Sequence, residues 1–179
     1  MRKTLLRFAM TCIVAVLAVN FSMAAVSIPT TGFCGDGDDL EAVQWSFDML
    51  SGTLTISGEG EMADFASGDA APWYSWQSDI TNLIVEEGVT RIGNYACFQY
   101  PQLKSVSMAG SVFSIGECAL AYNSSLATIT CMATMTIPWI EPDILEGCSA
   151  LTAIYVPEAA LDSYQNATCW SPYCVPFSP

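Results

Sequence analysis

The 179-residue sequence contains no histidine and only five Lys and Arg residues, against 18 Asp and Glu. Without histidine, the usual general base near neutral pH and the commonest metal ligand are both missing. Nucleic acids are polyanions whose binding depends on Lys and Arg contacts to phosphates. The composition therefore argues against histidine-dependent catalysis and against a nucleic-acid partner.

The short motifs of common catalytic and cofactor sites are also missing. The sequence has no G-x-S-x-G, G-x-x-x-x-G-K or G-x-G-x-x-G segment, which are the marks of a nucleophile elbow, a phosphate loop and a dinucleotide site. It has no C-x-x-C pair for zinc, and the acidic cluster at 36–41 lacks the spacing of an EF-hand loop. We predict no enzyme activity, no cofactor and no metal site. A carboxylate-dependent glycoside hydrolase, which needs no histidine, is kept as a remote alternative.

Residues 1–24 are predicted to be a cleavable signal peptide. Arg2, Lys3 and Arg7 precede an apolar run at 8–19, and small residues at 22–24 provide a cleavage site after Ala24. Cleavage leaves two basic residues against 18 acidic ones, a net charge near −16, which repels polyanions and anionic membrane surfaces. No later apolar run approaches the roughly 20 residues of a membrane span. We predict a secreted or cell-surface protein with no transmembrane span in the mature chain.

Seven of the eight cysteines follow the predicted signal peptide. Export makes disulfides chemically permissible, and the odd count leaves at least one thiol free or paired between chains. Cys169 and Cys174, which flank a Trp-Ser-Pro-Tyr segment, are the favoured disulfide, and the others also fit small buried residues. The odd thiol supports an alternative function, a structural or assembly component that joins chains at the cell surface.

The middle of the chain aligns with itself at a period of 23 residues, which lengthens to 25 in the last interval. Three columns of the alignment are apolar throughout. The first holds Ile80, Leu103, Leu126 and Leu151; the second holds Leu83, Val106, Ile129 and Ile154; the third holds Val85, Met108, Cys131 and Val156. Each unit therefore predicts a short strand with one face inward.

The second half of each unit predicts a return path. The pair Ile92-Gly93 recurs as Ile115-Gly116, and its glycines suit a tight corner. The segments behind it, 94–99, 117–122 and 143–147, have room for about one helical turn, and the third unit has Pro138, Trp139 and Pro142 in place of the Ile-Gly corner. Because one unit cannot bury its own apolar face, the units must stack. We predict an α+β, mostly β solenoid over 80–156, with the second column as one interior row.

Both flanking segments are predicted to cover the ends of the solenoid. In 25–79, alternating apolar residues over 43–49 resume at Leu54 and Ile56 after Ser51-Gly52, which predicts an N-terminal β-hairpin cap followed by a linker. In 157–179, Pro157 is expected to begin a helix that runs to Asn166 and forms a C-terminal cap with the tail.

The units at 80–98 and 103–126 resemble the BspA-like leucine-rich repeats of bacterial and protist surface proteins, with EGCSAL at 146–151 matching the end of a unit. Segment 51–76 is similar to the leader before such repeats, and 154–165 looks like their closing segment. Departures are Cys97 and Leu120 in place of Phe, and Tyr100 and Asn123 in place of Cys. The resemblance implies an exported, non-enzymatic solenoid for adhesion or recognition.

The outward strand positions are the candidate binding face, because a repeat protein ordinarily offers this face to a partner. A solvated face without a ligand is the competing interpretation, since Ser and Thr also suit exposed strands. The candidate contacts are Ile84, Ser105, Ser107, Thr128, Thr130 and Tyr155. Trp73, Tyr74 and Trp76 form an aromatic cluster that could stack on sugar rings or a protein, although covering the solenoid end is their favoured role. We predict an exported binding module for an extracellular protein or glycan.

Overall fold

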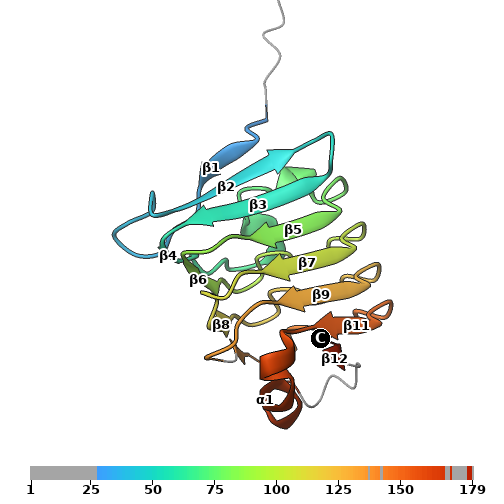
Figure 1. Cartoon of the computed structure of the whole chain (residues 1–179). Helices are drawn as coiled ribbons and strands as arrows, with labels where there is room; N and C mark the ends of the chain where they lie inside the picture. Colours follow the sequence, from blue (N-terminus) through green and yellow to red (C-terminus); the bar gives the residue numbers. More distant parts are fainter. Residues whose placement is uncertain (1–27, 137, 142, 168–169, 171–176, 179) are drawn as a thin grey trace, which may run out of the picture.

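The computed structural model describes residues 28–136, 138–141, 143–167, 170 and 177–178. Its larger sheet has eight strands in the order β1-β2-β3-β5-β7-β9-β11-β12, and all neighbours from β3 onward are parallel. These strands are β1 (Thr31–Phe33), β2 (Val43–Asp48), β3 (Thr53–Gly58), β5 (Asn82–Val85), β7 (Ser105–Met108), β9 (Thr128–Cys131), β11 (Ala153–Tyr155) and β12 (Phe177–Ser178). Figure 1 shows them stacked along the molecule, and β3, β5, β7, β9 and β11 belong to successive turns of a solenoid of about four turns.

The interior row of the larger sheet confirms the predicted stacking. Leu83 pairs with Val106, Val106 with Ile129, and Ile129 with Ile154 in parallel register. All four side chains are at most 2% exposed. The row also extends backwards to Leu54 of β3, so the second strand of the predicted hairpin is itself the first strand of the parallel stack.

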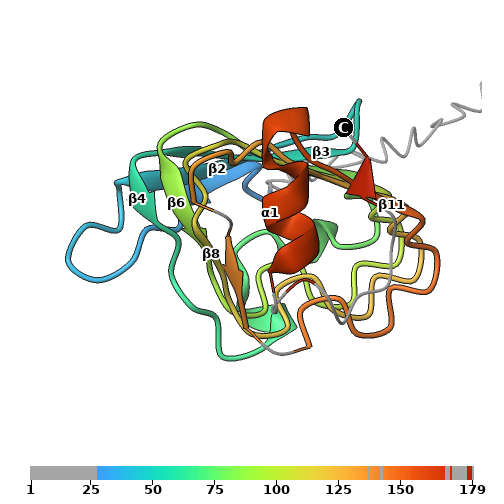
Figure 2. The same ribbon diagram turned by 60° about the horizontal axis from the view of Figure 1, so that its bottom comes forward.

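A second, smaller sheet closes each turn. Its parallel strands lie in the order β10-β8-β6-β4, and Figure 2 shows them to one side of the larger sheet. They are β4 (Gly60–Glu61), β6 (Val89–Ile92), β8 (Ser114–Ile115) and β10 (Trp139–Ile140). Ile140 pairs with Ile115 and is buried. The third unit therefore keeps the isoleucine of the corner, and only its glycine is replaced, by Glu141.

The third side of each unit is a turn and not a helix. Segments 94–99, 117–122 and 143–147 are turns throughout. Each segment has a residue with positive φ near its beginning and another at or near its end. Those near the beginning are Tyr95, Cys118 and Asp143, with φ of 55°, 51° and 63°. Those at or near the end are Gln99, Tyr122 and Gly147, with φ of 61°, 59° and 70°. A left-handed residue interrupts a right-handed helix, which explains why the expected helical turn does not form.

The Ile-Gly corners require glycine because neighbouring turns come close together there. Neither Gly93 nor Gly116 is among the residues with positive φ. A Cβ atom on Gly93 would lie 1.9 Å from the Ala63 carbonyl oxygen of the preceding turn, and one on Gly116 would lie 2.7 Å from the backbone nitrogen of Asn94. The glycines at these corners therefore allow neighbouring turns to approach closely, and they do so without a positive φ.

The ends of the stack are covered as predicted. At the N-terminal end, β2 pairs antiparallel with β3, and two short 3-10 helices, η1 (Gly68–Ala70) and η2 (Tyr74–Trp76), follow β4. At the other end, η3 (Glu158–Ala160) leads into α1 (Leu161–Asn166), which lies across the last turn in Figure 2. Tyr164 of α1 is buried against Trp170, with ring centroids 5.7 Å apart. Within the described residues, no helix has the length and apolar character needed to cross a membrane.

Candidate functional site

The outward positions of β3, β5, β7, β9 and β11 form one continuous surface, here called the strand face. Because side chains alternate between the two faces of a sheet, the register places them in two rows. One row is Thr53, Asn82, Ser105, Thr128 and Ala153; the other is Thr55, Ile84, Ser107, Thr130 and Tyr155. The six strand residues predicted as contacts thus lie together on one face.

Two side chains of the strand face are more exposed than the others in their row. Ile84 is 40% exposed and Tyr155 is 41% exposed, whereas the hydroxyl residues between them are partly buried. Both belong to the same row and are separated by three strand intervals, a distance of about 14 Å at the usual spacing of paired strands. This separation is too large for one small ligand and suits a broad partner surface.

The strand face is polar but uncharged. In the rows described above, none of the outward positions is ionisable except Tyr155, and Lys104 and Glu86 lie only at the edges, beside β7 and β5. Side chains are bonded across the strands, since the Ser105 hydroxyl donates to Asn82 Oδ1 over 2.8 Å. A partner would therefore be recognised by shape and by hydroxyl hydrogen bonds rather than by ion pairs.

A hollow of about 420 Å³ extends the strand face at its N-terminal end. Ser46 of β2 pairs with Thr55, which places it in the same row as Ile84. Phe33 of β1 forms part of the lining and is 52% exposed. Trp45 Nε1 is buried and, among the described residues, has no hydrogen-bond partner. Sequence reasoning missed this hollow because nothing in the pattern at 28–33 indicates a strand.

Trp73 does not belong to a ligand surface. Its side chain is 0% exposed, donates from Nε1 to the Ala96 carbonyl over 2.9 Å, and packs edge-on against Trp45 and Phe65 at 5.8 and 5.5 Å between centroids. A fully buried ring cannot contact a ligand, so Trp73 leaves the set of candidate contacts. Trp76 is half-buried, donates to the Pro29 carbonyl and packs against Phe47. Both contacts suit the covering role.

The favoured disulfide, Cys169 with Cys174, lies outside the described residues. The five cysteines that are described, at 34, 97, 118, 131 and 148, are free thiols. Burial raises the pKa of the thiols of Cys34, Cys97 and Cys131 to about 12. These three cysteines are small buried residues, which is the alternative to disulfide pairing that the sequence offered.

Cys118 is a half-exposed thiol, and we expect it to react slowly. Partial burial, followed by the negative charges of Glu117 and Asp143, raises its pKa above the usual value. Because only the thiolate is nucleophilic, alkylation of Cys118 by iodoacetamide should be slow near pH 7.5 and accelerate as the pH rises through the raised pKa. Peptide mapping by mass spectrometry measures the rate at this site. Fast modification at pH 7.5, comparable to that of an unstructured cysteine peptide, would contradict the expectation.

The described residues contain no group of three or more Cys, Asp or Glu side chains arranged to hold a metal ion. The acidic side chains Asp36, Asp39, Glu59 and Glu61 do line a shallow depression near β4. Its lining offers no further feature that points to a cation.

The match to a family model agrees with this repeat geometry. A family model described as a BspA-type leucine-rich repeat region, in six copies, matches residues 72–170. A leucine-rich repeat protein from Eubacterium ventriosum ATCC 27560, solved at 2.50 Å, is similar with 20% identity and a TM-score of 0.48. The match covers 74% of this chain and 46% of the other, so the chain spans about half of that protein's length. No curated protein matches the sequence.

Proposed function

Because the chain belongs to the BspA-type leucine-rich repeat family, we propose that it is an exported binding module whose strand face contacts an extracellular protein or glycan. Leucine-rich repeats are typical of protein binding, and the family and its fold are typically non-catalytic. The observation that carries the proposal is the continuous strand face, on which all six predicted contacts of β5 to β11 lie.

Export is supported by two independent features. The family is commonly secreted or surface-associated, and residues 1–24 have the charge and apolar pattern of a signal peptide. That segment lies outside the described residues. The folded part carries an excess of acidic groups, so its partner is expected to be neutral or basic rather than a nucleic acid or an anionic membrane.

The shape of the strand face favours a protein partner over a single small molecule. A small ligand is usually bound in a concave pocket, whereas the exposed residues of β5 and β11 lie about 14 Å apart on a sheet surface. Ile84 and Tyr155 offer apolar contact area, and the hydroxyl rows between them offer hydrogen bonds. Tyrosine, as at 155, is one of the residue types that are enriched among the energetic centres of protein interfaces.

Binding to an array of extracellular-matrix proteins and glycans at physiological salt tests the proposal. If a partner binds, the double variant Ile84→Ala/Tyr155→Ala should weaken binding by roughly tenfold or more, the usual effect of truncating anchor residues. Its unfolding free energy should change by only about 0.5 kcal/mol per site, because both side chains are exposed.

The matched control is Trp139→Ala, which removes an aromatic that is 60% exposed on the smaller sheet. This variant should bind as the unchanged protein does. Equal losses in the control and in the double variant would place binding elsewhere. A folded protein that binds no spot on the array would count against the proposal as a whole.

A further inference from the structure

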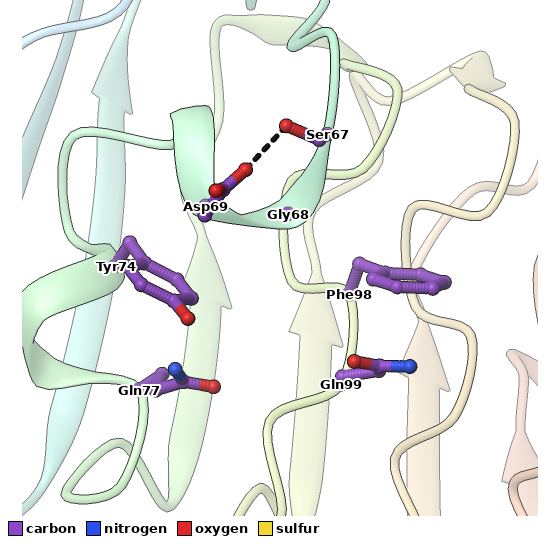
Figure 3. A pocket seen from close by; sticks show the side chains of 7 residues that line it. All are labelled: Ser67, Gly68, Asp69, Tyr74, Gln77, Phe98 and Gln99. Atoms are coloured by element: carbon purple, nitrogen blue, oxygen red, sulfur yellow. Dashed lines mark hydrogen bonds between the residues drawn. The ribbon is translucent and has the colours of Figure 1, made fainter.

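A second hollow lies away from the strand face, where η1 and η2 meet the turn at 94–99 of the next solenoid unit. It has a volume of about 270 Å³ and is lined by Ser67, Asp69, Tyr74, Gln77, Phe98 and Gln99. None of these residues is in the strand face, and Tyr74 belongs to the aromatic cluster that the sequence offers as a possible stacking surface. Figure 3 shows the close-up of this pocket.

The two walls of the pocket come from different turns. In Figure 3, the side chains of Tyr74 and of Gln77, which directly follows η2, point toward the turn that carries Phe98 and Gln99, and the Phe98 ring extends away from them. Ser67 and Asp69 close a third side, and the Ser67 hydroxyl donates to the Asp69 carboxylate. Tyr74 is 38% exposed, so its ring presents a flat apolar surface beside two amides, a hydroxyl and a carboxylate.

The Phe98 wall is held in place before any ligand arrives. The Phe98 ring packs edge-on against Tyr95 and Tyr122, each with centroids 5.5 Å away. Its other side lies against the backbone of Gly68, where an added Cβ would stand 3.0 Å from Phe98 Cβ and Cδ1. A wall that is already ordered costs little conformational entropy on binding.

The chemistry of the lining selects among ligand classes. None of the described residues that line the pocket is basic, and Asp69 carries a negative charge, which disfavours phosphate, sulfate and carboxylate groups. A single carboxylate is a poor cation cage, since calcium needs six to eight oxygen ligands. A sugar ring has apolar C–H faces that pack on an aromatic ring and hydroxyls that pair with amides and carboxylates. The volume of about 270 Å³ lies just below the range of about 300–1,000 Å³ for drug-sized ligands, which suits a single small unit.

We propose that this pocket binds one neutral sugar unit of a glycan, with Tyr74 as the stacking surface and Gln77, Gln99 and Asp69 as hydroxyl partners. The site is separate from the strand face and shares no residue with it. A result that contradicts binding at one site therefore leaves the proposal for the other site untouched.

The test uses the purified protein with methyl glycosides of glucose, galactose, mannose and N-acetylglucosamine, and with neutral oligosaccharides that contain them. Saturation-transfer NMR detects contact, and titration gives the affinity. Tyr74→Ala should weaken binding about tenfold or more, and Tyr74→Phe, which keeps the ring, should retain most of it. Trp139→Ala removes an exposed aromatic elsewhere and should bind as the unchanged protein does.

Gln77→Ala supplies a second variant that removes a hydroxyl partner without changing the ring, and it should also weaken binding. Thermal unfolding of every variant confirms that it is folded. The proposal is overturned if the folded protein binds none of these sugars, or if Tyr74→Ala and Gln77→Ala bind them unchanged. Binding of tetramethylammonium at this pocket in preference to every sugar would also overturn it, since that result would identify a cation site.

Discussion

Replacing Gly93 with alanine is expected to destabilise the protein by about 3 kcal/mol or more, because the new methyl group would overlap backbone of the preceding turn. The Cβ would stand 1.9 Å from the Ala63 carbonyl oxygen and 2.7 Å from the carbonyl carbon. A backbone carbonyl cannot rotate away as a flexible side chain can, so two turns of the solenoid must separate. For a chain of this size, the melting temperature should fall by roughly 10 °C.

Thermal unfolding followed by circular dichroism measures the effect, and Gly110→Ala is the matched control. A Cβ on Gly110 would have its nearest neighbour, the Met132 carbonyl oxygen, at 3.4 Å, which is ordinary contact. This variant should unfold within a few degrees of the unchanged protein, consistent with a stability change of about 1 kcal/mol or less. Equal melting temperatures for the two variants would show that close packing at the Ile-Gly corner does not decide stability.

Replacing Asn123 with alanine is the second change expected to have a large effect. Asn123 is fully buried and joins three backbone groups: it accepts from the Tyr100 N–H over 2.7 Å and donates to the carbonyls of Cys97 and Leu120 over 2.9 and 2.7 Å. Alanine would leave the Tyr100 N–H and the Cys97 carbonyl without a partner in the interior, whereas the Leu120 carbonyl would keep its bond from the Cys148 thiol. Since each unsatisfied buried group costs about 1–3 kcal/mol, a loss of roughly 3 kcal/mol or more is expected.

Urea unfolding at equilibrium measures this loss, with Ser124→Ala as the neighbouring exposed control. A third variant, Asn123→Cys, is expected to have an intermediate stability. At the equivalent place in the next unit, the Cys148 thiol donates to the Leu120 carbonyl over 3.1 Å, so a cysteine at 123 should restore one of the three bonds and fall between the other two variants. If Asn123→Ala and Ser124→Ala have the same midpoint, the buried asparagine does not support its neighbours in this way.

The contacts of Asn123 bear on one departure of this chain from the usual repeat sequence. The resemblance places Cys where Asn123 stands, and the structure shows what the substitution achieves. The amide side chain bonds to both its own unit and the preceding one, through Leu120 and Cys97. Asn94 acts similarly at the corner, where its Oδ1 accepts from the Glu117 N–H over 2.8 Å. Polar side chains therefore link successive turns outside the sheets.

The binding proposals differ in how much of them could be read from the sequence. The strand face could be predicted from the 23-residue period. Because side chains alternate along a strand, an interior row in every unit implies that the neighbouring positions form outward rows. The sugar pocket does not follow from any pattern. Tyr74 and Phe98 are 24 residues apart and belong to segments that are not equivalent in the repeat, so only the stacking of η2 on the next turn brings their walls together.

The sequence alone determined the repeat, the interior row from Leu83 to Ile154, the hairpin and the helix that cover the two ends. It could do so because a unit of about 23 residues cannot bury its own apolar face, and the period of apolar residues therefore dictates which side chains must meet. Only the tertiary structure decided that the corner glycines serve close approach, that Trp73 is buried, and that hollows form beside β1 and η2. Those outcomes depend on distances of a few ångströms between neighbouring turns, and such distances arise from packing rather than from the order of apolar and polar residues.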